Sequence, residues 1–282
     1  MKVCYIIGYP IGHSMSPTMH NAAFRELGLD YKYEAAPIEP ERLAGFLDGV
    51  LRRPDIRGAS VTIPHKIAVI EQLDVVNREA ADIGAVNTIV NDEGTLKGYN
   101  TDGLGALKAL KESAGDLSDK RTVLLGAGGA ARAVAYRLVQ EAGGLIILNR
   151  TARRAVELAE YLRGKAGSRR IEVSAAPLDE AHLARAVGGS DILINATPVG
   201  MHPNVEGTPV PRHILHSRLL VFDLVYNPLR TRLMREAEAA GAGTLSGVEM
   251  LVYQGAEAFR LWTGREAPVG LMLRVVREAL GG

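Results

Sequence analysis

The chain has 282 residues, of which 47% are hydrophobic and 23% charged, with a formal net charge of +1, and this composition predicts a packed core in one large or two medium domains. Because basic and acidic residues are interspersed and no apolar run approaches the roughly 20 residues that span a bilayer, neither a nucleic acid nor a membrane is expected as a partner. Cys4 is the only cysteine, which excludes an internal disulfide and a cysteine-rich zinc site, so we expect no metal and a cytoplasmic location.

The N-terminal part of the chain alternates between strand-like and helix-like segments. It opens with "MKVCYIIGYP", whose apolar run is too short for a signal peptide and predicts a strand. Further strands are predicted at "YKYEAAPI" and "IRGASVTI", and "GAVNTIV" and "TLKGY" should form a hairpin around "NDEG". Apolar residues at helical spacing predict helices over 17–27 and 40–51. We therefore expect an α/β domain with a mixed sheet.

The pattern changes at Asp102, where Leu104, Leu107 and Leu110 indicate a helix that connects two domains. The stretch "RTVLLGAGGAARAVAYRLVQEAGGLIILNR" then has the strand, glycine turn, helix and strand of a βαβ unit. Strands are predicted at "IEVSAA", "DILINA" and "LLVFDLV", separated by helical candidates, which is typical of a doubly wound parallel sheet of Rossmann type.

Two helices are predicted after "GTLSG", namely "VEMLVYQGAEAFRLW" and a short one beyond Pro268, and they are expected to fold back on the first domain. The predicted domains are therefore residues 1–101 completed by 247–282, which would bind the substrate, and residues 102–246, which would bind a nucleotide.

A glycine turn follows the first strand of the second domain. Gly126, Gly128 and Ala131 fit the pattern G-x-G-x-x-G/A between a strand and a helix. These small residues permit a tight turn, a close approach of the backbone to a pyrophosphate and close helix–sheet packing. The helix N-terminus would then offer free N–H groups and a partial positive charge. The turn therefore predicts dinucleotide binding.

The end of the next strand predicts which dinucleotide is bound. An NAD-binding chain usually has an acidic residue there, which holds the ribose 2′-hydroxyl. This chain has Asn149, Arg150 and Thr151 instead, with Arg153 and Arg154 close behind. A guanidinium binds a 2′-phosphate with charge-assisted, often bidentate hydrogen bonds. The expected cofactor is therefore NADP.

Polar residues near the N-terminus suggest an anion site. In "GYPIGHSMSPTMHN", Ser16 stands before Pro17 and is predicted to cap the helix, whereas Ser14 has no such local role. Two hydroxyls beside a helix N-terminus make a pocket suited to a small carboxylate.

Four other polar residues occupy positions that suggest a specific hydrogen-bonding or charged role. In "SVTIPHK", Pro64 ends a strand and Lys66 follows it. Asn87 lies within a strand-like run, which disfavours asparagine. Asp102 is predicted to cap a helix, and Gln254 lies on an apolar helical face, where it needs a hydrogen-bond partner.

Taken together, these segments resemble the shikimate dehydrogenase family. The matching stretches occur in the family's order over almost the whole chain: "GYPIGHSMSPTMHN", "SVTIPHK", "GAVNTI", "GYNTDGLG", "GAGGAARAV", "LNRT", "NATPVGM", "DLVYNPLRTRLM" and "GVEMLVYQGAEAF". The resemblance implies a reversible, NADP-dependent reduction of 3-dehydroshikimate to shikimate in aromatic amino-acid (chorismate) biosynthesis.

The resemblance also implies a role for each matched residue. The catalytic acid–base pair would be Lys66 and Asp102. The substrate would be bound by Ser14 and Ser16 at its carboxylate, by Thr62, Asn87 and Gln254 at its hydroxyls, and by Tyr226. The cofactor would be bound by Gly126, Ala127, Gly128, Gly129, Ala130, Ala131, Asn149, Arg150, Thr151, Arg154 and Gly247. In one departure, Ser60 stands where the family usually has asparagine, and this residue is expected to support the neighbouring loop.

Two alternatives stay open at this point. One is a quinate/shikimate dehydrogenase that also uses NAD, although Arg150 argues against NAD. The other is a non-catalytic sensor of shikimate-like ligands, which the presence of both Lys66 and Asp102 disfavours. The sequence is compatible with a monomer and with a homodimer.

Overall fold

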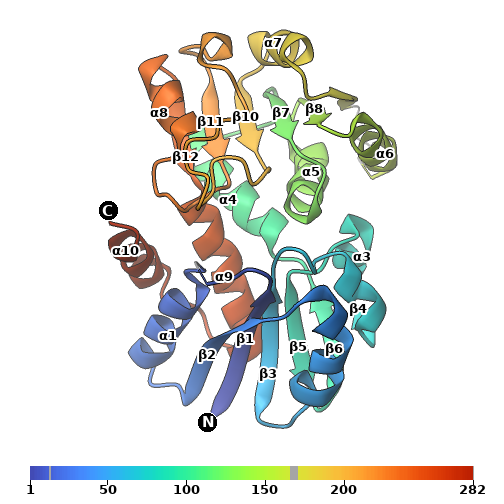
Figure 1. Ribbon diagram of the computed structural model, residues 1–282, viewed down its shortest axis with the longest axis vertical. Helices are drawn as coiled ribbons and strands as arrows, with labels where there is room; N and C mark the ends of the chain where they lie inside the picture. Colours follow the sequence, from blue (N-terminus) through green and yellow to red (C-terminus); the bar gives the residue numbers. More distant parts are fainter. Residues whose placement is uncertain (13, 166–170, 282) are drawn as a thin grey trace. The chain divides into compact units, whose positions relative to one another are not determined.

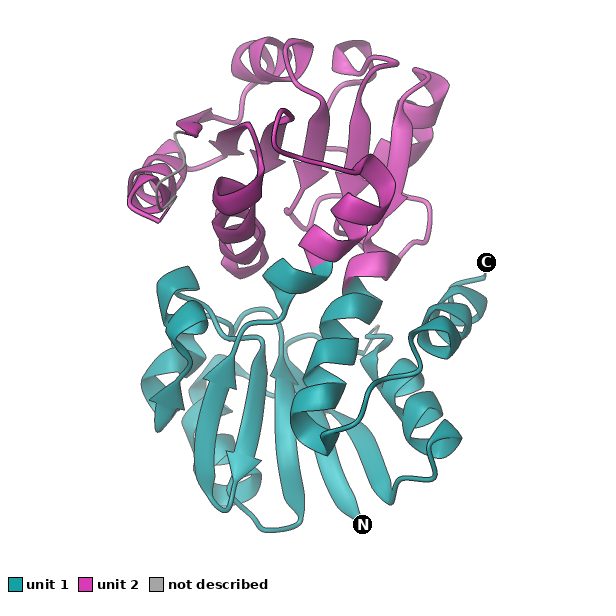
Figure 2. Cartoon of the chain, turned by 180° about the vertical axis from the view of Figure 1, so that it is seen from behind, with its two compact units in different colours: residues 1–105, 251–282 teal, residues 106–250 magenta. Residues whose placement is uncertain are grey.

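The computed structural model describes residues 1–12, 14–165 and 171–281. The chain divides into two compact units, which Figure 2 colours separately: unit 1 comprises Met1–Gly105 and Leu251–Gly282, and unit 2 comprises Ala106–Met250. Both boundaries fall inside helices, α4 (Asp102–Ala114) and α9 (Gly247–Thr263), whereas the sequence placed the boundaries at the starts of these helices.

The strands of unit 1 are β1 (Lys2–Gly8), β2 (Tyr31–Pro37), β3 (Ile56–Val61), β4 (Val75–Val76), β5 (Thr88–Asp92) and β6 (Thr95–Tyr99). Its other helices are α1 (Ser16–Glu26), α2 (Leu43–Phe46), α3 (Arg78–Ile83) and α10 (Val269–Ala279). The strands of unit 2 are β7 (Arg121–Leu125), β8 (Gly144–Asn149), β9 (Glu172–Pro177), β10 (Ile192–Asn195), β11 (Leu220–Asp223) and β12 (Gly243–Ser246). Its remaining helices are α5 (Gly129–Glu141), α6 (Ala152–Arg163), α7 (Glu180–Gly188) and α8 (Arg232–Ala239). Within the described residues, no helix combines the length and apolarity that a membrane span requires.

The sheet of unit 1 has the strand order β2-β1-β3-β5-β6-β4. Strands β1, β2 and β3 are mutually parallel, whereas β3, β5 and β6 are joined by antiparallel pairing. The mixed sheet and the hairpin around "NDEG" are therefore confirmed. The two-residue strand β4 was not predicted, because so short a segment carries no periodicity.

The helical segment 40–51 covers one face of this sheet. It is a 3-10 turn, then α2, then a π-helical turn, rather than the single α-helix predicted from its apolar spacing. Leu47 and Leu51 pack against Ile7, Val61 and Ile89 of the sheet. The predicted buried face is correct although the helix type varies along it.

Helices α1, α9 and α10 lie on the other side of this sheet (Figure 1), where aromatic side chains of α1, α9 and β2 pack together. His20 and Phe24 from α1 meet Phe259 and Trp262 from α9, and the ring of Tyr33 from β2 lies among them. Trp262 also donates its indole N–H to the carbonyl of Ile89 at 2.9 Å. The C-terminal part of the chain thus completes the core of unit 1.

The sheet of unit 2 has the order β12-β11-β10-β7-β8-β9, and every pair is parallel. This is the doubly wound Rossmann order, in which ligands bind at the carboxyl ends of the strands where the order reverses, here between β7 and β10. Helices α5 and α6 lie on one face of the sheet, and α7 and α8 pack on the other (Figure 1). The predicted fold class is confirmed.

Two details of unit 2 differ from the prediction. No helix longer than the 3-10 turn Arg212–Ile214 joins β10 to β11. This connection contains Pro198, Pro203, Pro209 and Pro211, and each proline removes a backbone donor that a helix would need. Strand β12 was missed because "GTLS" is short and begins with glycine.

Candidate active site

Lys66 lies in a turn beyond β3 rather than at the tip of the strand. β3 ends at Val61, earlier than predicted. The backbone then turns, with the N–H of His65 donating to the carbonyl of Thr62 at 2.9 Å. The N–H of Val86 donates to the carbonyl of Lys66 at 2.8 Å. The backbone that carries Lys66 is therefore tied to the neighbouring chain segment.

Lys66 and Asp102 form an ion pair inside unit 1. The Lys66 Nζ lies 2.5 Å from Asp102 Oδ2, and the two side chains are only 15% and 5% exposed. The other carboxylate oxygen, Oδ1, accepts a hydrogen bond from Asn87 Nδ2 at 2.9 Å. A charged pair this far from water needs such partners to be tolerated. An ammonium has three donors, so Lys66 retains N–H bonds that it can direct at a further acceptor.

The backbone around Asp102 leaves its carboxylate available to Lys66. Helix α4 begins at Asp102, so this residue is the first of the helix and not the capping residue that was predicted. Instead, Asn100 Oδ1 accepts the Asp102 N–H at 3.1 Å. The amide of Asn100 in turn donates to the carbonyl of Ala85 at 2.9 Å. Asn100 therefore takes the local role that sequence reasoning gave to Asp102.

Asn87 is the centre of a buried polar network. It precedes β5 instead of lying within it, and its Oδ1 accepts from the N–H of Thr101 at 2.8 Å and from the hydroxyl of Thr88 at 3.0 Å. Its Nδ2 has three acceptors in range, namely Asp102 Oδ1, Thr101 Oγ1 at 2.9 Å and Gln254 Oε1 at 3.2 Å. An amide nitrogen carries two hydrogens, so one acceptor is left over for a hydroxyl donor.

Gln254 reaches this network from α9. It is 8% exposed, and its Nε2 donates to the carbonyl of Leu251 at 2.7 Å. Its Oε1 points at Asn87. The partner that a glutamine on an apolar stripe requires is therefore the network itself.

The two serines at the start of α1 differ from the prediction in their local hydrogen bonds. The capping position is Met15, not Ser16, and it makes no side-chain capping bond. Ser14 accepts the N–H of Ser16 at 3.3 Å through its hydroxyl oxygen, so Ser14 does have a local role. Among the described residues, neither the Ser16 hydroxyl nor that of Thr62 has a hydrogen-bond partner. Both hydroxyls remain able to bind a ligand.

The glycine turn between β7 and α5 fits a dinucleotide. Gly126 has a φ of +112°, and a Cβ there would lie 3.0 Å from the carbonyl oxygen of Ala196, so only glycine suits this position. Gly128 precedes α5, carries no side-chain cap and faces open space. Ala131 is fully buried against the sheet. The first N–H groups of α5 are thus accessible to a pyrophosphate.

The residues after β8 fit a 2′-phosphate. Asn149 ends the strand, and its amide donates to the carbonyl of Thr151 at 3.0 Å, which shapes the turn. Arg150 and Arg154 are exposed, and within the described part of the chain neither guanidinium has an ion-pair partner. Arg153, in contrast, pairs with Glu157 at 2.7 Å. Two free cations therefore stand at the site where NAD-binding chains place an acid.

Gly247 and Tyr226 belong to unit 2. A Cβ on Gly247 would lie 2.4 Å from the carbonyl oxygen of Leu224, which requires glycine for packing reasons. Tyr226 is half-buried in the segment after β11. The other residues assigned to the substrate, Ser14, Ser16, Thr62, Asn87 and Gln254, all belong to unit 1.

A buried aspartate organises the carboxyl ends of β10 and β11. Asp223 accepts hydrogen bonds from Asn195 Nδ2 at 2.9 Å, from the Val225 N–H at 3.1 Å and from the Thr231 hydroxyl at 2.7 Å. Thr231 in turn caps α8. Burial raises the pKa of Asp223 to about 6, against the opposing effect of these hydrogen bonds. Sequence reasoning gave no role to this network.

Asp223 should make the stability of the protein depend on pH. Because its pKa is higher in the folded than in the unfolded chain, the folded state binds this proton more tightly. The free energy of unfolding should therefore fall, by on the order of 3 kcal/mol, as the pH rises from about 4 to about 6. Urea unfolding of the wild type and of Asp223→Asn across this range measures the effect. The variant should lack this part of the decrease; parallel curves would contradict the assignment.

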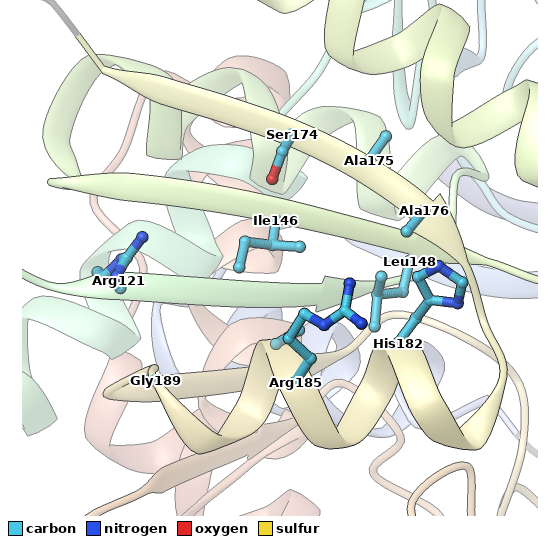
Figure 3. Close-up of a pocket in the computed structure, with 10 residues that line it drawn as sticks. Arg121, Ile146, Leu148, Ser174, Ala175, Ala176, His182, Arg185 and Gly189 are labelled. Carbon is cyan, nitrogen blue, oxygen red and sulfur yellow. The ribbon is translucent and has the colours of Figure 1, made fainter.

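A groove on unit 2 lies away from these residues. It has a volume of about 390 Å³ and runs between α7 and strands β8 and β9 of unit 2, where Arg185 and His182 point toward an apolar floor (Figure 3). None of the residues predicted for catalysis or binding lines it. Among the described residues, no group of histidine, cysteine and acidic side chains has the geometry of a metal site.

The network residues that sequence reasoning missed in unit 1 are Thr101 and Asn100. Both stand in the quoted stretch "GYNTDGLG", and both are buried. Consecutive polar residues between a strand and an apolar helix were a signal that could have identified them, since a buried polar side chain must find partners.

Family models match most of the chain. The model described as "Shikimate dehydrogenase substrate binding domain" matches residues 6–89, that described as "Shikimate / quinate 5-dehydrogenase" matches residues 108–226, and that described as "Shikimate 5'-dehydrogenase C-terminal domain" matches residues 247–277.

Individual proteins are similar over nearly the whole length. The chain is 51% identical to a shikimate dehydrogenase (NADP(+)) of Methanopyrus kandleri, over 99% of this chain and 96% of the relative. A crystal structure of a shikimate dehydrogenase in complex with NADP+ superimposes with a TM-score of 0.91 at 43% identity, covering 99% of this chain and 96% of that one. The enzyme of Thermus thermophilus in complex with NADP(H) and shikimate superimposes with a TM-score of 0.88 at 40% identity, covering 99% of this chain and 100% of that one.

Proposed function

The chain belongs to the shikimate dehydrogenase family, and from this premise we propose that Lys66 and Asp102 carry out the proton transfer of its reaction. The activity is that of an NADP-dependent oxidoreductase acting on a CH–OH group, which interconverts 3-dehydroshikimate and shikimate in aromatic amino-acid biosynthesis. The observation that carries the proposal is the buried Lys66–Asp102 pair beside the Asn87 network.

We assign substrate binding to unit 1 and cofactor binding to unit 2. Ser14 and Ser16 would hold the substrate carboxylate, and Thr62, Asn87 and Gln254 would hold hydroxyls. The spare acceptor around Asn87 Nδ2 is suited to a hydroxyl donor. Shikimate is a small ring with one carboxylate and three hydroxyls, so these groups are sufficient to fix its orientation.

Lys66 would donate the proton during reduction and accept it during oxidation. During reduction, negative charge develops on the carbonyl oxygen of the substrate, and the ammonium of Lys66 would stabilise that charge and donate its proton to the oxygen. In the reverse direction a neutral Lys66 would accept the hydroxyl proton. Asp102, held by Asn87, would orient the Lys66 side chain toward the reacting oxygen.

The residues of unit 2 would hold NADP. The N-terminus of α5 after Gly126 and Gly128 would bind the pyrophosphate, and Arg150 and Arg154 would bind the 2′-phosphate, with Asn149 and Thr151 shaping that turn. NADPH, when bound, supplies the hydride. The protein's task is to orient the ring and to exchange one proton with it.

An absorbance assay in the reduced-nicotinamide band tests the proposed function. Purified protein with shikimate and NADP should form NADPH, and quinate with NAD should react much more slowly. The family model that matches residues 108–226 covers quinate as well as shikimate enzymes, so the assay needs all four combinations. Shikimate binding without turnover would instead support a ligand sensor.

The oxidation of shikimate should accelerate toward alkaline pH. The alcohol loses a proton in this direction, which Lys66 would accept and pass to the solvent, and a higher pH favours this release of a proton. Initial rates at saturating shikimate and NADP between about pH 7 and pH 10 measure this dependence. A deuterium isotope effect from shikimate labelled at the reacting carbon confirms that chemistry limits the rate. A flat profile under that condition would remove Lys66 from the proton transfer.

We also propose that the protein acts in the cytoplasm without a nucleic-acid partner. Its single cysteine is buried and free, and basic and acidic residues are almost equal in number, at 33 and 32. Gel filtration with light scattering distinguishes the monomer from the homodimer, both of which remain compatible with the proposal.

A further inference from the structure

We propose that Tyr33 is a positioning residue for the substrate site, because its phenol holds the hydroxyl of Ser60 beside the residues that bind the ring. This inference rests on the proposed function and extends it to a residue outside the assigned set. It begins from Ser60, which replaces the asparagine usual in the family.

Ser60 lies inside β3, within the strand predicted at "IRGASVTI". Along a strand, every second side chain points to the same face, so Ser60 shares its face with Thr62. In the antiparallel pairing of β3 with β5, Ser60 stands directly opposite Thr88. Opposite side chains in such a pair are neighbours. Thr88 donates to Asn87 Oδ1 at 3.0 Å, so Ser60 adjoins both Thr62 and the Asn87 network.

The hydroxyl of Ser60 is held in place by Tyr33. The Tyr33 hydroxyl donates to Ser60 Oγ at 2.7 Å, and the two residues are 2% and 7% exposed. As the acceptor of this bond, Ser60 keeps its own proton, and no acceptor for that proton lies among the described residues. The proton is therefore available to a bound molecule or to a water in the site.

The ring of Tyr33 has little freedom to move. It stacks on His20 with the ring centroids 4.5 Å apart and an angle of 13° between the planes, and Trp262 lies 5.8 Å away. His20 is fully buried, and both ring nitrogens lack a partner among the described residues. Burial lowers the pKa of His20 to about 3. His20 therefore contributes an uncharged flat surface, which fixes the direction of the phenol.

These contacts predict a specific kinetic effect. Without the phenol, Ser60 can rotate its hydroxyl away from the site, which weakens substrate binding but leaves the Lys66–Asp102 pair in place. Tyr33→Phe removes only the hydroxyl and keeps the ring stack. We expect the KM for shikimate and its Kd in calorimetry to rise about 3- to 10-fold, the usual worth of one buried hydrogen bond. The kcat and the KM for NADP should change less than about twofold.

Matched variants separate positioning from general destabilisation. Ser60→Ala should raise the KM as Tyr33→Phe does, and the double variant should be no worse than either single one, because both remove the same bond. Tyr31→Phe is the control: Tyr31 is on the same strand, and its hydroxyl contacts the carbonyl of Trp262 at 3.4 Å rather than Ser60. It should leave all kinetic constants unchanged.

Two results would overturn the inference. One is a Tyr33→Phe variant with a lower melting temperature but an unchanged shikimate Kd, since Tyr33 would then serve only the core. The other is an additive double variant. Failure of the proposed function is distinguishable, because in that case the wild type itself would fail to bind shikimate in the calorimeter or would bind it without forming NADPH in the absorbance assay.

Discussion

Replacing Lys66 with alanine should lower kcat by about 10²- to 10⁴-fold, the usual contribution of a group that transfers a proton in the transition state. Substrate binding should change much less, because the ring contacts proposed for Asn87, Thr62 and Gln254 do not require the Lys66 side chain. The measurement is kcat and KM in both directions, together with the shikimate Kd. An intact Kd with a large loss of kcat places Lys66 in the chemical step.

Lys97 offers a matched control. It too is a lysine of unit 1 paired with an aspartate, Asp92, at 2.6 Å, but its side chain is 36% exposed, against 15% for Lys66. Lys97→Ala should leave kcat within about twofold, since exposed pairs contribute little. If Lys66→Ala retained nearly normal kcat, or if both variants lost activity equally, the assignment of Lys66 would be wrong.

Replacing Arg150 with alanine should change the choice of cofactor. The guanidinium is expected to make charge-assisted hydrogen bonds to the 2′-phosphate, and such bonds contribute about 1.5–3 kcal/mol. The KM for NADP should therefore rise about 10- to 100-fold, whereas the KM for NAD, which lacks this phosphate, should stay the same. Steady-state kinetics with both cofactors at saturating shikimate measure the ratio.

Arg153 provides the control for this experiment. It lies three residues further on, but Glu157 already pairs with it, and its side chain is 85% exposed. Arg153→Ala should leave both KM values unchanged. An equal rise for NADP and NAD in Arg150→Ala would mean that this arginine supports the turn rather than the phosphate.

The sequence predicted the elements whose pattern is local. The glycine turn at Gly126 and the alternation of apolar strands and helices around it carry their own periodicity, and they were sufficient to identify the Rossmann unit. Elements without periodicity were missed, such as the four-residue β12. The helix expected before β11 is absent because the prolines between β10 and β11 remove backbone donors that a helix needs.

The sequence predicted which residues belong to the candidate site but not how their side chains contact one another. Lys66, Asp102, Asn87 and Gln254 were identified from their unusual positions and from the family resemblance. Their mutual contacts were not, because each joins segments far apart in the chain. The bond from Tyr33 to Ser60 and that from Asn195 to Asp223 are of the same kind. Long-range hydrogen bonds depend on strand register, which single-sequence patterns determine poorly.

The proposed assignment of substrate binding to unit 1 and of cofactor binding to unit 2 has a consequence for how such an enzyme can evolve. In the proposed assignment, the residues that recognise the ring lie in the outer stretches of the chain, apart from Tyr226, and those that choose the coenzyme lie in the middle stretch. Because the free-energy effects of residues that share no partners usually add, changes that favour a new substrate and changes that favour a different dinucleotide could be selected separately. Descendants that differ in only one of these two traits are then accessible by ordinary point mutation.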